Sequence, residues 1–254
     1  MTPGEYFSRV ESAALAFSGG TDSAYLLYLA LANGCDVAAY YVKTQFQPEF
    51  EREDAEAMAE KLGARLRVID MDVLASHEVA ENTPSRCYFC KKRIMGAILA
   101  RARADGYETV MDGTNASDHA EERPGMKALN EMNIISPLRE MGFTKLQIRE
   151  RSKEAGLFTW NKPAYACLAT RIPFGAEITA ERLRKIEQGE EVLFKMGFSD
   201  FRVRMTTEGS ARIEVTEKQM EQVFRKRSAV VRELGKLFCG VSLSLVPRED
   251  TVNG

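Results

Sequence analysis

The sequence predicts an α/β protein built on a doubly wound parallel sheet, followed by a smaller α+β domain. In the first half of the chain, short apolar runs alternate with helical patterns, which is typical of parallel β-α-β units. From about residue 179 the order changes to helix, strand, strand, helix, strand, which is typical of an α+β domain. We therefore expect a first domain at 1–157, a linker at 158–178 and a small second domain at 179–254.

The elements of the first domain follow from hydrophobic spacing. The apolar run 13–17 (AALAF) ends at a glycine loop, and the next segment, 23–32, has Ala and Leu at helical spacing. Thr144 is suited to cap a helix, because its hydroxyl can accept a hydrogen bond from a free backbone N–H. Further strands are expected at 37–42, 66–69 and 108–111, and helices at 4–11, 48–62, 87–103 and 144–155.

The first domain is followed by an irregular linker and then by the elements of the second domain. The linker contains two prolines and shows no clear period between 158 and 175. The second domain is expected to contain helices at 179–196 and 218–237, with strands at 201–205, 211–215 and 241–246.

Composition narrows the class of function. The net charge of −2 argues against a protein whose main task is gripping nucleic acid, and favours a small-molecule substrate. The sequence contains no run of 18 apolar residues and no apolar secretory segment at its start, so we expect a soluble, cytoplasmic protein that does not enter a membrane. Cysteines in the cytosol stay reduced and are more often ligands or nucleophiles than disulfide partners.

The glycine loop reads Ser18-Gly19-Gly20-Thr21-Asp22-Ser23. Parallel sheets bind ligands at the carboxyl ends of their strands, and glycines let backbone N–H groups converge on an anion there. The loop lacks the Gly-Lys-Ser/Thr ending of a Walker A motif, and a strand–helix turn without a ligand is the alternative. The whole string resembles the PP-loop of ATP pyrophosphatases. That resemblance implies that the loop holds the pyrophosphate of ATP, with Asp22 near Mg²⁺.

Three of the five cysteines stand out. Cys87 and Cys90 form a CxxC beside basic residues, which favour the thiolate, and Cys167 lies in the linker. The CxxC is open to interpretation as half a zinc site, a redox pair or a coincidence, since neither a second CxxC nor a histidine pair completes a zinc finger. Three thiolates could also hold an iron–sulfur cluster with one open iron. We expect Cys35 and Cys239 to be core residues.

Several segments together resemble the LarE-type sulfur transferases over most of the chain, from about residue 10 to 235. The family uses ATP and Mg²⁺ to adenylate a carboxylate of pyridinium-3,5-biscarboxylate mononucleotide, and then forms a thiocarboxylate. Its product becomes the nickel-pincer nucleotide. Some members sacrifice the sulfur of a cysteine that matches Cys167, while others hold a [4Fe-4S] cluster on three cysteines that match Cys87, Cys90 and Cys167. The matching segments read SGGTDS, SRCYFCKK, DGTN, KPAYACLATRIPFG and FRVRMTTEGSARIEV.

The resemblance also implies roles for individual side chains. Arg202 and Arg204 alternate along an expected strand and would bind the substrate's phosphate, although two solvent-facing arginines are the simpler interpretation. Acidic residues near the transferable sulfur would position Mg²⁺ or another metal, or else are ordinary surface charges. The further residues with an implied role are Gly113 and Arg171 for ATP and Glu190 and Glu214 for a metal.

The chain departs from the family pattern at its end, where it reads LSLVPR in place of the usual Asp-Leu-x-Gly-Tyr-Arg. That difference affects the expected substrate and the expected homo-oligomer. Three other functions compete: a PP-loop tRNA thiolase, which would bring a basic face; an amide-forming synthetase, in which the three cysteines would be idle; and an ATP-binding regulatory module. With the cluster, a sulfide source is the expected partner besides the nucleotide substrate.

Overall fold

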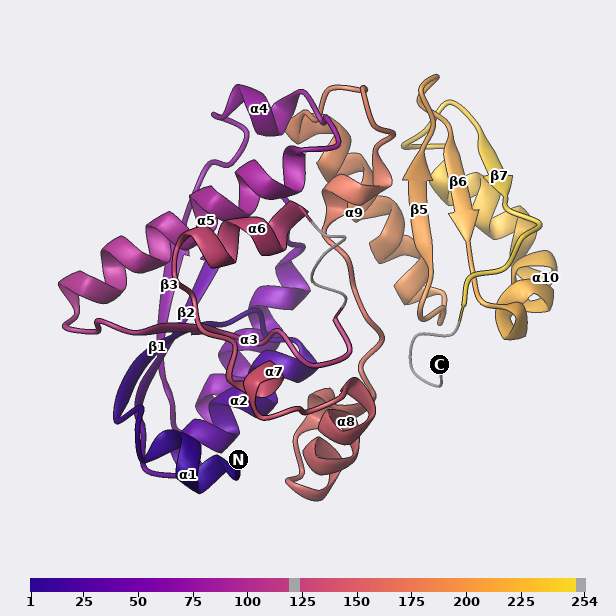
Figure 1. Cartoon of the computed structure of the whole chain (residues 1–254). Helices are drawn as coiled ribbons and strands as arrows, with labels where there is room; N and C mark the ends of the chain where they lie inside the picture. Colours follow the sequence, from indigo (N-terminus) through magenta and orange to yellow (C-terminus); the bar gives the residue numbers. More distant parts are fainter. Residues whose placement is uncertain (119–123, 250–254) are drawn as a thin grey trace. The chain divides into compact units, whose positions relative to one another are not determined.

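The computed structural model describes residues 1–118 and 124–249. Its main sheet contains strands β1 (Ser12–Ala16), β2 (Asp36–Lys43), β3 (Arg65–Asp70) and β4 (Val110–Asp112) in the order β3-β2-β1-β4 (Figure 1). All neighbouring strands in this sheet are parallel, with Ala14 of β1 opposite Ala38 of β2. The expected parallel α/β fold is therefore confirmed.

Helices cover both faces of the sheet. Successive side chains of a strand point to opposite faces, so neighbouring residues of β1 enter different cores. Leu15 belongs to one core together with Leu26 and Ile148, whereas Ala14 belongs to the other with Met95 and Leu129. Helices α2 (Thr21–Ala32), α3 (Glu49–Lys61) and α8 (Lys145–Glu154) contribute to the first core, and α5 (Arg86–Ala104) and α6 (Pro124–Glu131) to the second.

Local sequence sets the start of the expected helices. The Thr144 hydroxyl accepts a hydrogen bond from the Gln147 N–H, and the Gln147 side chain accepts one from the Thr144 N–H. This reciprocal capping box confirms Thr144 as the N-cap of α8. The shorter elements of the chain, besides those described above and below, are α1 (Pro3–Phe7), α7 (Pro137–Glu140), η1 (Phe158–Asn161) and η2 (Leu168–Arg171).

The chain packs into two compact units. Unit 1 contains Met1–Val73 and Ser85–Lys162, and unit 2 contains Leu74–Pro84 and Pro163–Gly254. The early segment of unit 2 includes α4 (His77–Ala80) and is held by backbone hydrogen bonds from Ile178 N–H to Ala80 C=O at 2.8 Å and from Gly175 N–H to Asn82 C=O at 3.1 Å. The domain boundaries expected at 157 and 178 stay a prediction.

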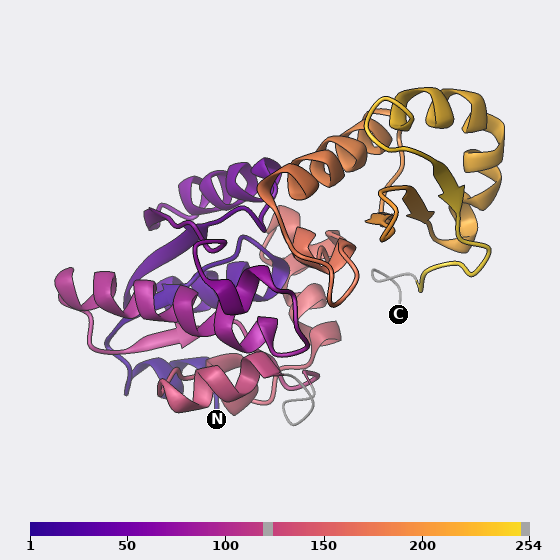
Figure 2. The same cartoon turned by 90° about the horizontal axis from the view of Figure 1, so that it is seen from above.

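Unit 2 has its own small sheet of β5 (Arg202–Met205), β6 (Ala211–Glu214) and β7 (Val241–Leu243), coloured orange to yellow in Figure 2. Strand β6 pairs antiparallel with β5 and parallel with β7. With α9 (Ala180–Lys195) and α10 (Glu217–Leu234), the order is helix, strand, strand, helix, strand, which confirms the expected α+β pattern.

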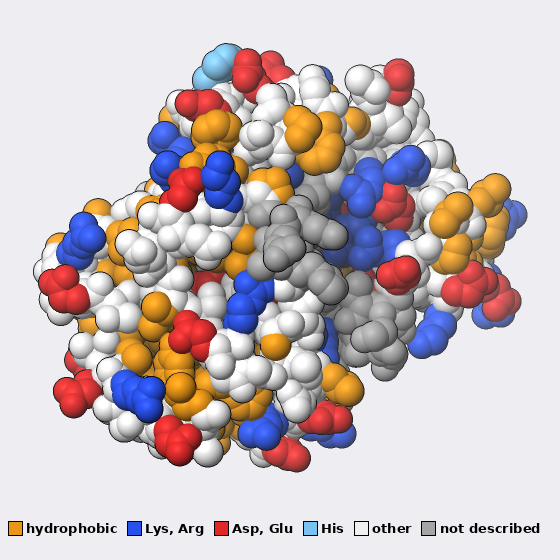
Figure 3. All heavy atoms as spheres, in the orientation of Figure 1, with side chains coloured by type: hydrophobic (Ala, Val, Ile, Leu, Met, Phe, Trp, Pro, Cys, Tyr) orange, Lys and Arg blue, Asp and Glu red, His pale blue; other side chains and the backbone are white. Residues whose placement is uncertain are grey.

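The distribution of charged side chains on the surface agrees with the net charge of −2. Acidic and basic side chains are interspersed over the part of the face in Figure 3 that unit 1 forms. Across residues 1–118 and 124–249, none of the helices combines the length and the apolar character that crossing a membrane demands.

Candidate active site

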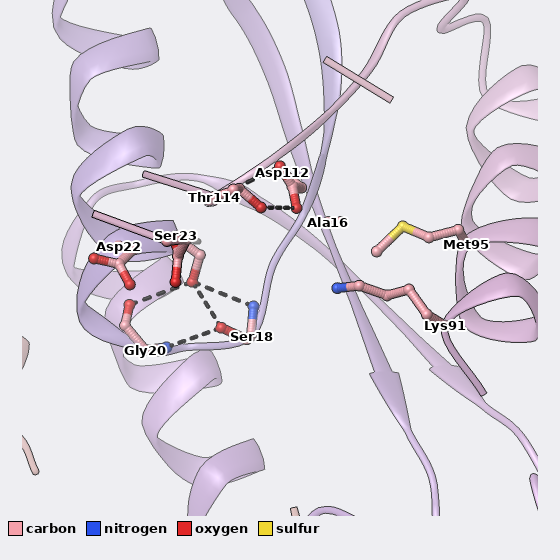
Figure 4. A pocket seen from close by; sticks show the side chains of 11 residues that line it. Ala16, Ser18, Gly20, Asp22, Ser23, Lys91, Met95, Asp112 and Thr114 are labelled. Atoms are coloured by element: carbon pink, nitrogen blue, oxygen red, sulfur yellow. Dashed lines mark hydrogen bonds between the residues drawn. The ribbon is translucent and has the colours of Figure 1, made fainter. Parts of the chain in front are cut away.

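A cavity of about 200 Å³ lies in unit 1 at the carboxyl ends of β1 and β4 (Figure 4). This is the edge at which open parallel sheets bind their ligands. Most of the glycine loop faces it. The lining residues are Ala16, Ser18, Gly20, Asp22, Ser23, Lys91, Met95, Asp112, Gly113, Thr114 and Asp118.

The glycine loop has the backbone that its sequence suggests. Gly19 has a φ of +70°, and a Cβ there would lie 3.0 Å from the Ala55 Cα, so a larger residue would be both strained and obstructed. Gly20 is the N-cap of α2 and provides no side-chain cap. The first turn of α2 therefore offers its N–H groups and the positive end of its dipole to an anion.

The loop after β4 lines the cavity beside the glycine loop. A Cβ on Gly113 would lie 2.9 Å from the Ser23 nitrogen, so this glycine permits direct contact with the first turn of α2. The buried Asp112 carboxylate accepts hydrogen bonds from the Thr114 hydroxyl at 2.6 Å and the Ser136 hydroxyl at 2.7 Å. Asp112 thus fixes the turn of the DGTN segment.

Asp22 is the carboxylate at the start of α2. Its Oδ2 accepts a hydrogen bond from Lys145 Nζ at 2.7 Å, while its Oδ1 is buried without a hydrogen-bond partner among the described residues. Burial raises the pKa of Asp22, although Lys145 opposes that shift. A buried carboxylate oxygen without a partner suits a hard cation such as Mg²⁺. Sequence reasoning missed Lys145, because the pair joins residues far apart in the chain.

Thr21 ties the loop to η1, and Arg149 of α8 binds the same segment. The Thr21 hydroxyl donates a hydrogen bond to the Thr159 carbonyl at 2.7 Å. The Arg149 guanidinium donates to the carbonyls of Trp160 at 2.7 Å and Lys162 at 3.0 Å. The Thr21 bond holds the start of α2, and the Arg149 bonds hold α8, against the last residues of unit 1. The expected contact between Thr21 and phosphate stays a prediction.

The CxxC forms the first turn of α5, where Cys87 is exposed and Cys90 is half-buried. The buried Arg86 donates a long hydrogen bond from its Nη2 to Cys87 Sγ, at 3.6 Å. None of the five cysteines, all of which are described, is in a disulfide.

The described residues contain no group of three or more His, Cys, Asp or Glu side chains arranged to hold a metal ion. The three-cysteine cluster therefore stays a prediction, as does metal binding by Glu190 and Glu214. Of the two histidines, His77 is exposed and pairs with Glu81, while His119 lies outside the described residues.

The other two cysteines differ from each other. Cys35 is buried, as expected, and burial raises the pKa of its thiol to about 11. Our expectation for Cys239 was wrong, because this residue is exposed. It lies in the turn between α10 and β7, where its Sγ is 3.3 Å from the Ser210 hydroxyl.

Cys167 is the N-cap of η2 in unit 2, and Arg171 holds its backbone. Arg171 Nη1 donates hydrogen bonds to the carbonyls of Ala166 and Cys167 and to the Thr170 hydroxyl. Only 1% of Arg171 is exposed. In this arrangement the guanidinium positions residues 164–170, the Cys167 segment. The expected contact of Arg171 with ATP stays a prediction.

Glu190 balances the charge of Arg171. The two side chains form a buried ion pair, with Arg171 Nε 2.9 Å from Glu190 Oε1. Glu190 also accepts hydrogen bonds from the Val203 N–H at 3.0 Å and from the Tyr165 hydroxyl. The Tyr165 ring stacks under Arg171, with 4.5 Å between the guanidinium carbon and the ring centroid.

Arg202 and Arg204 alternate on β5 and both reach the Cys167 segment. Arg202 Nη2 donates to the Ala164 carbonyl, and Arg204 Nη1 donates to the Thr170 carbonyl. Burial, with the charges of nearby arginines, lowers the pKa of Arg202 to about 10, so it remains charged at neutral pH. Arg204 also pairs with Glu214 at 2.7 Å. The expected binding of a substrate phosphate by these arginines stays a prediction.

A parallel sheet with the string SGGTDS between its first strand and the following helix defines the PP-loop class of ATP pyrophosphatases. The family model for queuosine biosynthesis protein QueC matches residues 12–84, which include this strand and loop.

Three relatives cover most of the chain. An uncharacterised protein of Synechocystis is 37% identical over 86% of this chain and 81% of its own. The pyridinium-3,5-bisthiocarboxylic acid mononucleotide synthase of Lactiplantibacillus plantarum is 33% identical over 91% of this chain and 84% of its own. An uncharacterised protein of Methanocaldococcus jannaschii is 33% identical over 86% and 83%. The chain belongs to the family of this synthase, the LarE-type sulfur transferases.

Proposed function

We propose that this protein is an ATP-dependent sulfur transferase of nickel-pincer nucleotide biosynthesis. It adenylates a carboxylate of pyridinium-3,5-biscarboxylate mononucleotide, releases pyrophosphate and converts the activated carboxylate into a thiocarboxylate. The observation that carries the proposal is the cavity formed by Ser18, Gly20, Asp22 and Ser23 in a chain that is 33% identical to a synthase of the bisthiocarboxylic product.

Adenylation uses the cavity of unit 1. The N–H groups and the dipole at the start of α2 hold the phosphate groups that leave as pyrophosphate. Asp22 Oδ1, which is buried and has no partner among the described residues, would hold the Mg²⁺ that accompanies ATP. Gly113 lets the loop after β4 lie directly against the glycine loop, because any side chain there would collide with the Ser23 backbone.

Sulfur transfer follows from the activated carboxyl group. A free carboxylate is a poor electrophile because its leaving group would be oxide, whereas an acyl adenylate loses AMP readily. A soft sulfur nucleophile then attacks the carboxyl carbon. Arg202 and Arg204 bind the phosphate of the substrate through charge-assisted hydrogen bonds, and these would replace their present bonds to the carbonyls of Ala164 and Thr170.

The source of the sulfur is the finer part of the proposal. Cys87 and Cys90 lie three residues apart on α5 and present two thiols from one helical turn. With Cys167 as the third ligand, they would hold a [4Fe-4S] cluster, which supplies a transferable sulfide when it is bound. In the alternative, Cys167 gives up its own sulfur and becomes dehydroalanine. A sulfide source and a homo-oligomer belong to the proposal as well.

The nucleotide product tests the adenylation. With ATP, Mg²⁺ and the mononucleotide, we expect AMP and pyrophosphate in equal amounts. If ADP and phosphate form instead, the PP-loop mechanism fails. A protein that gives AMP only with tRNA is a tRNA thiolase instead.

Cysteine variants test the sulfur source in protein purified without oxygen. With a cluster, the single changes Cys87→Ala, Cys90→Ala and Cys167→Ala each abolish bound iron and sulfur transfer but leave AMP formation intact. The matched change Cys239→Ala leaves both unaffected. If Cys167 alone is required and the protein loses the mass of H₂S after one turnover, Cys167 is the sacrificial donor and the cluster proposal is wrong.

A further inference from the structure

Lys91 stands out among the cavity-lining residues because it is the one cation among the described side chains there. It comes from α5, on the side of the cavity opposite the glycine loop. In Figure 4 its ammonium group points across the cavity toward Ser18. A ligand that occupied the cavity would therefore lie between the loop and Lys91.

Among the described residues that line the cavity, the carboxylates have hydrogen-bond partners and Lys91 has none. Asp22 is neutralised by Lys145, and the Asp112 carboxylate is bonded to Thr114 and Ser136. Lys91 Nζ, by contrast, forms no hydrogen bond or ion pair with any described residue. Three carboxylates line the cavity, with Asp118 as the third, so a bound polyphosphate needs a positive charge to offset their repulsion.

The helix register explains why Lys91 faces the cavity and its neighbour does not. Lys91 and Met95 are four residues apart, share one face of α5 and both line the cavity. Lys92 lies on another face, where its Nζ is 3.2 Å from the Tyr88 hydroxyl and 3.4 Å from Glu131 Oε2. Lys92 is therefore a matched control for Lys91: it is the same residue type at the next position, but its side chain does not line the cavity.

We propose that Lys91 binds a phosphate group of ATP that leaves as pyrophosphate, opposite the SGGTDS loop. This rests on the proposed function and adds a contact from α5, the helix that carries Cys87 and Cys90. A second explanation for a lysine at this position is that it only favours the thiolate of Cys87, which is four residues away on the same face.

The test compares Lys91→Met with Lys92→Met in the full chain, by calorimetric binding of inorganic pyrophosphate and of ATP with Mg²⁺. A charge-assisted bond of about 1.5–3 kcal/mol corresponds to a loss of about 10- to 150-fold in affinity. We expect Lys91→Met to show that loss for both ligands and a weaker dependence on salt. Lys92→Met and the binding of adenosine should remain at the wild-type level.

Three outcomes would overturn the assignment. If Lys91→Met binds pyrophosphate as tightly as wild type and changes only the rate at which Cys87 is alkylated, Lys91 acts on the thiol alone. If both lysine variants lose affinity equally, the loss reflects the lower net positive charge near the cavity and not a direct contact from Lys91. If wild type binds neither pyrophosphate nor ATP, the proposed function falls together with this contact.

Discussion

Replacing Glu190 with Gln is expected to destabilise the protein strongly, because it removes the counter-charge of a buried arginine. Glu190 is 1% exposed, and its two oxygens accept four hydrogen bonds, two of them from Arg171. A glutamine can still accept a bond from the Val203 N–H, but its amide group turns a donor toward Arg171 or Tyr165.

The size of the effect follows from the burial of the pair. Breaking a buried ion pair by neutralising one partner costs about 3–5 kcal/mol, because the remaining charge is left uncompensated. For a chain of this length that corresponds to a fall in melting temperature of roughly 6–20 °C. The measurement is urea unfolding followed by circular dichroism, together with a thermal melt.

Glu191→Gln is the matched control on the next position of α9. Its ion pair with Lys195 is exposed, so its loss should change stability by no more than about 1 kcal/mol. The double variant Arg171→Met/Glu190→Gln should lose less than the sum of the two single variants, since it leaves no unpaired charge. If Glu190→Gln is within about 1 kcal/mol of wild type, the pair does not hold the Cys167 segment as we describe.

Three further predictions concern the carboxylates and the β5 arginines. Asp22→Asn should lower Mg²⁺-dependent AMP formation by about 100-fold while the circular dichroism spectrum stays unchanged, given the charge stabilisation that a metal supplies; wild-type turnover in this variant would remove Asp22 from the metal site. Arg202→Ala and Arg204→Ala should weaken binding of the substrate mononucleotide by about 10-fold or more and ATP binding less; unchanged binding of the mononucleotide would make them structural residues only. For Glu214, burial alone would raise the pKa, but the bonds from Arg204 and Arg212 lower it below the usual value. Its contribution to stability is therefore present above the unfolded pKa of about 4.3 and lost as the pH falls through the lower folded pKa, so the advantage of wild type over Glu214→Gln should disappear in acid; a constant difference from neutral pH to about pH 3 would contradict this.

Local pattern predicted much of the fold. The apolar run at 13–17 and the Ala- and Leu-rich segment after the glycine loop predicted β1 and α2, because both are buried apolar stretches and the loop marks the boundary between them. The cap at Thr144 was also readable from a single residue and its neighbours. The segment around Asn82 was not. Asn82 has a φ of +57° and donates hydrogen bonds to the carbonyls of Pro173 and Ala176, and contacts that distant leave no local signal.

The residues of the candidate site likewise divide into those that a local motif predicted and those that only tertiary packing reveals. Loop residues such as Gly20 and Asp22 were predicted because a short motif carries their chemistry. Lys145 and Lys91 were not predicted as site residues, since only tertiary packing brings α8 beside α2, where Lys145 meets Asp22, and brings Lys91 of α5 to the cavity. The bonds from Arg202 and Arg204 to the backbone around Cys167 were likewise invisible, because β-strand alternation gives a face but not its neighbour.

The most direct test of the central claim is the mass of the mononucleotide product. The protein, purified without oxygen, is incubated with ATP, Mg²⁺ and pyridinium-3,5-biscarboxylate mononucleotide, and the products are separated and weighed by mass spectrometry. We predict that the mononucleotide exchanges one carboxylate oxygen for sulfur and that one AMP forms for each exchange. An unchanged mononucleotide, in a preparation that nevertheless forms AMP with another acceptor, would contradict the account.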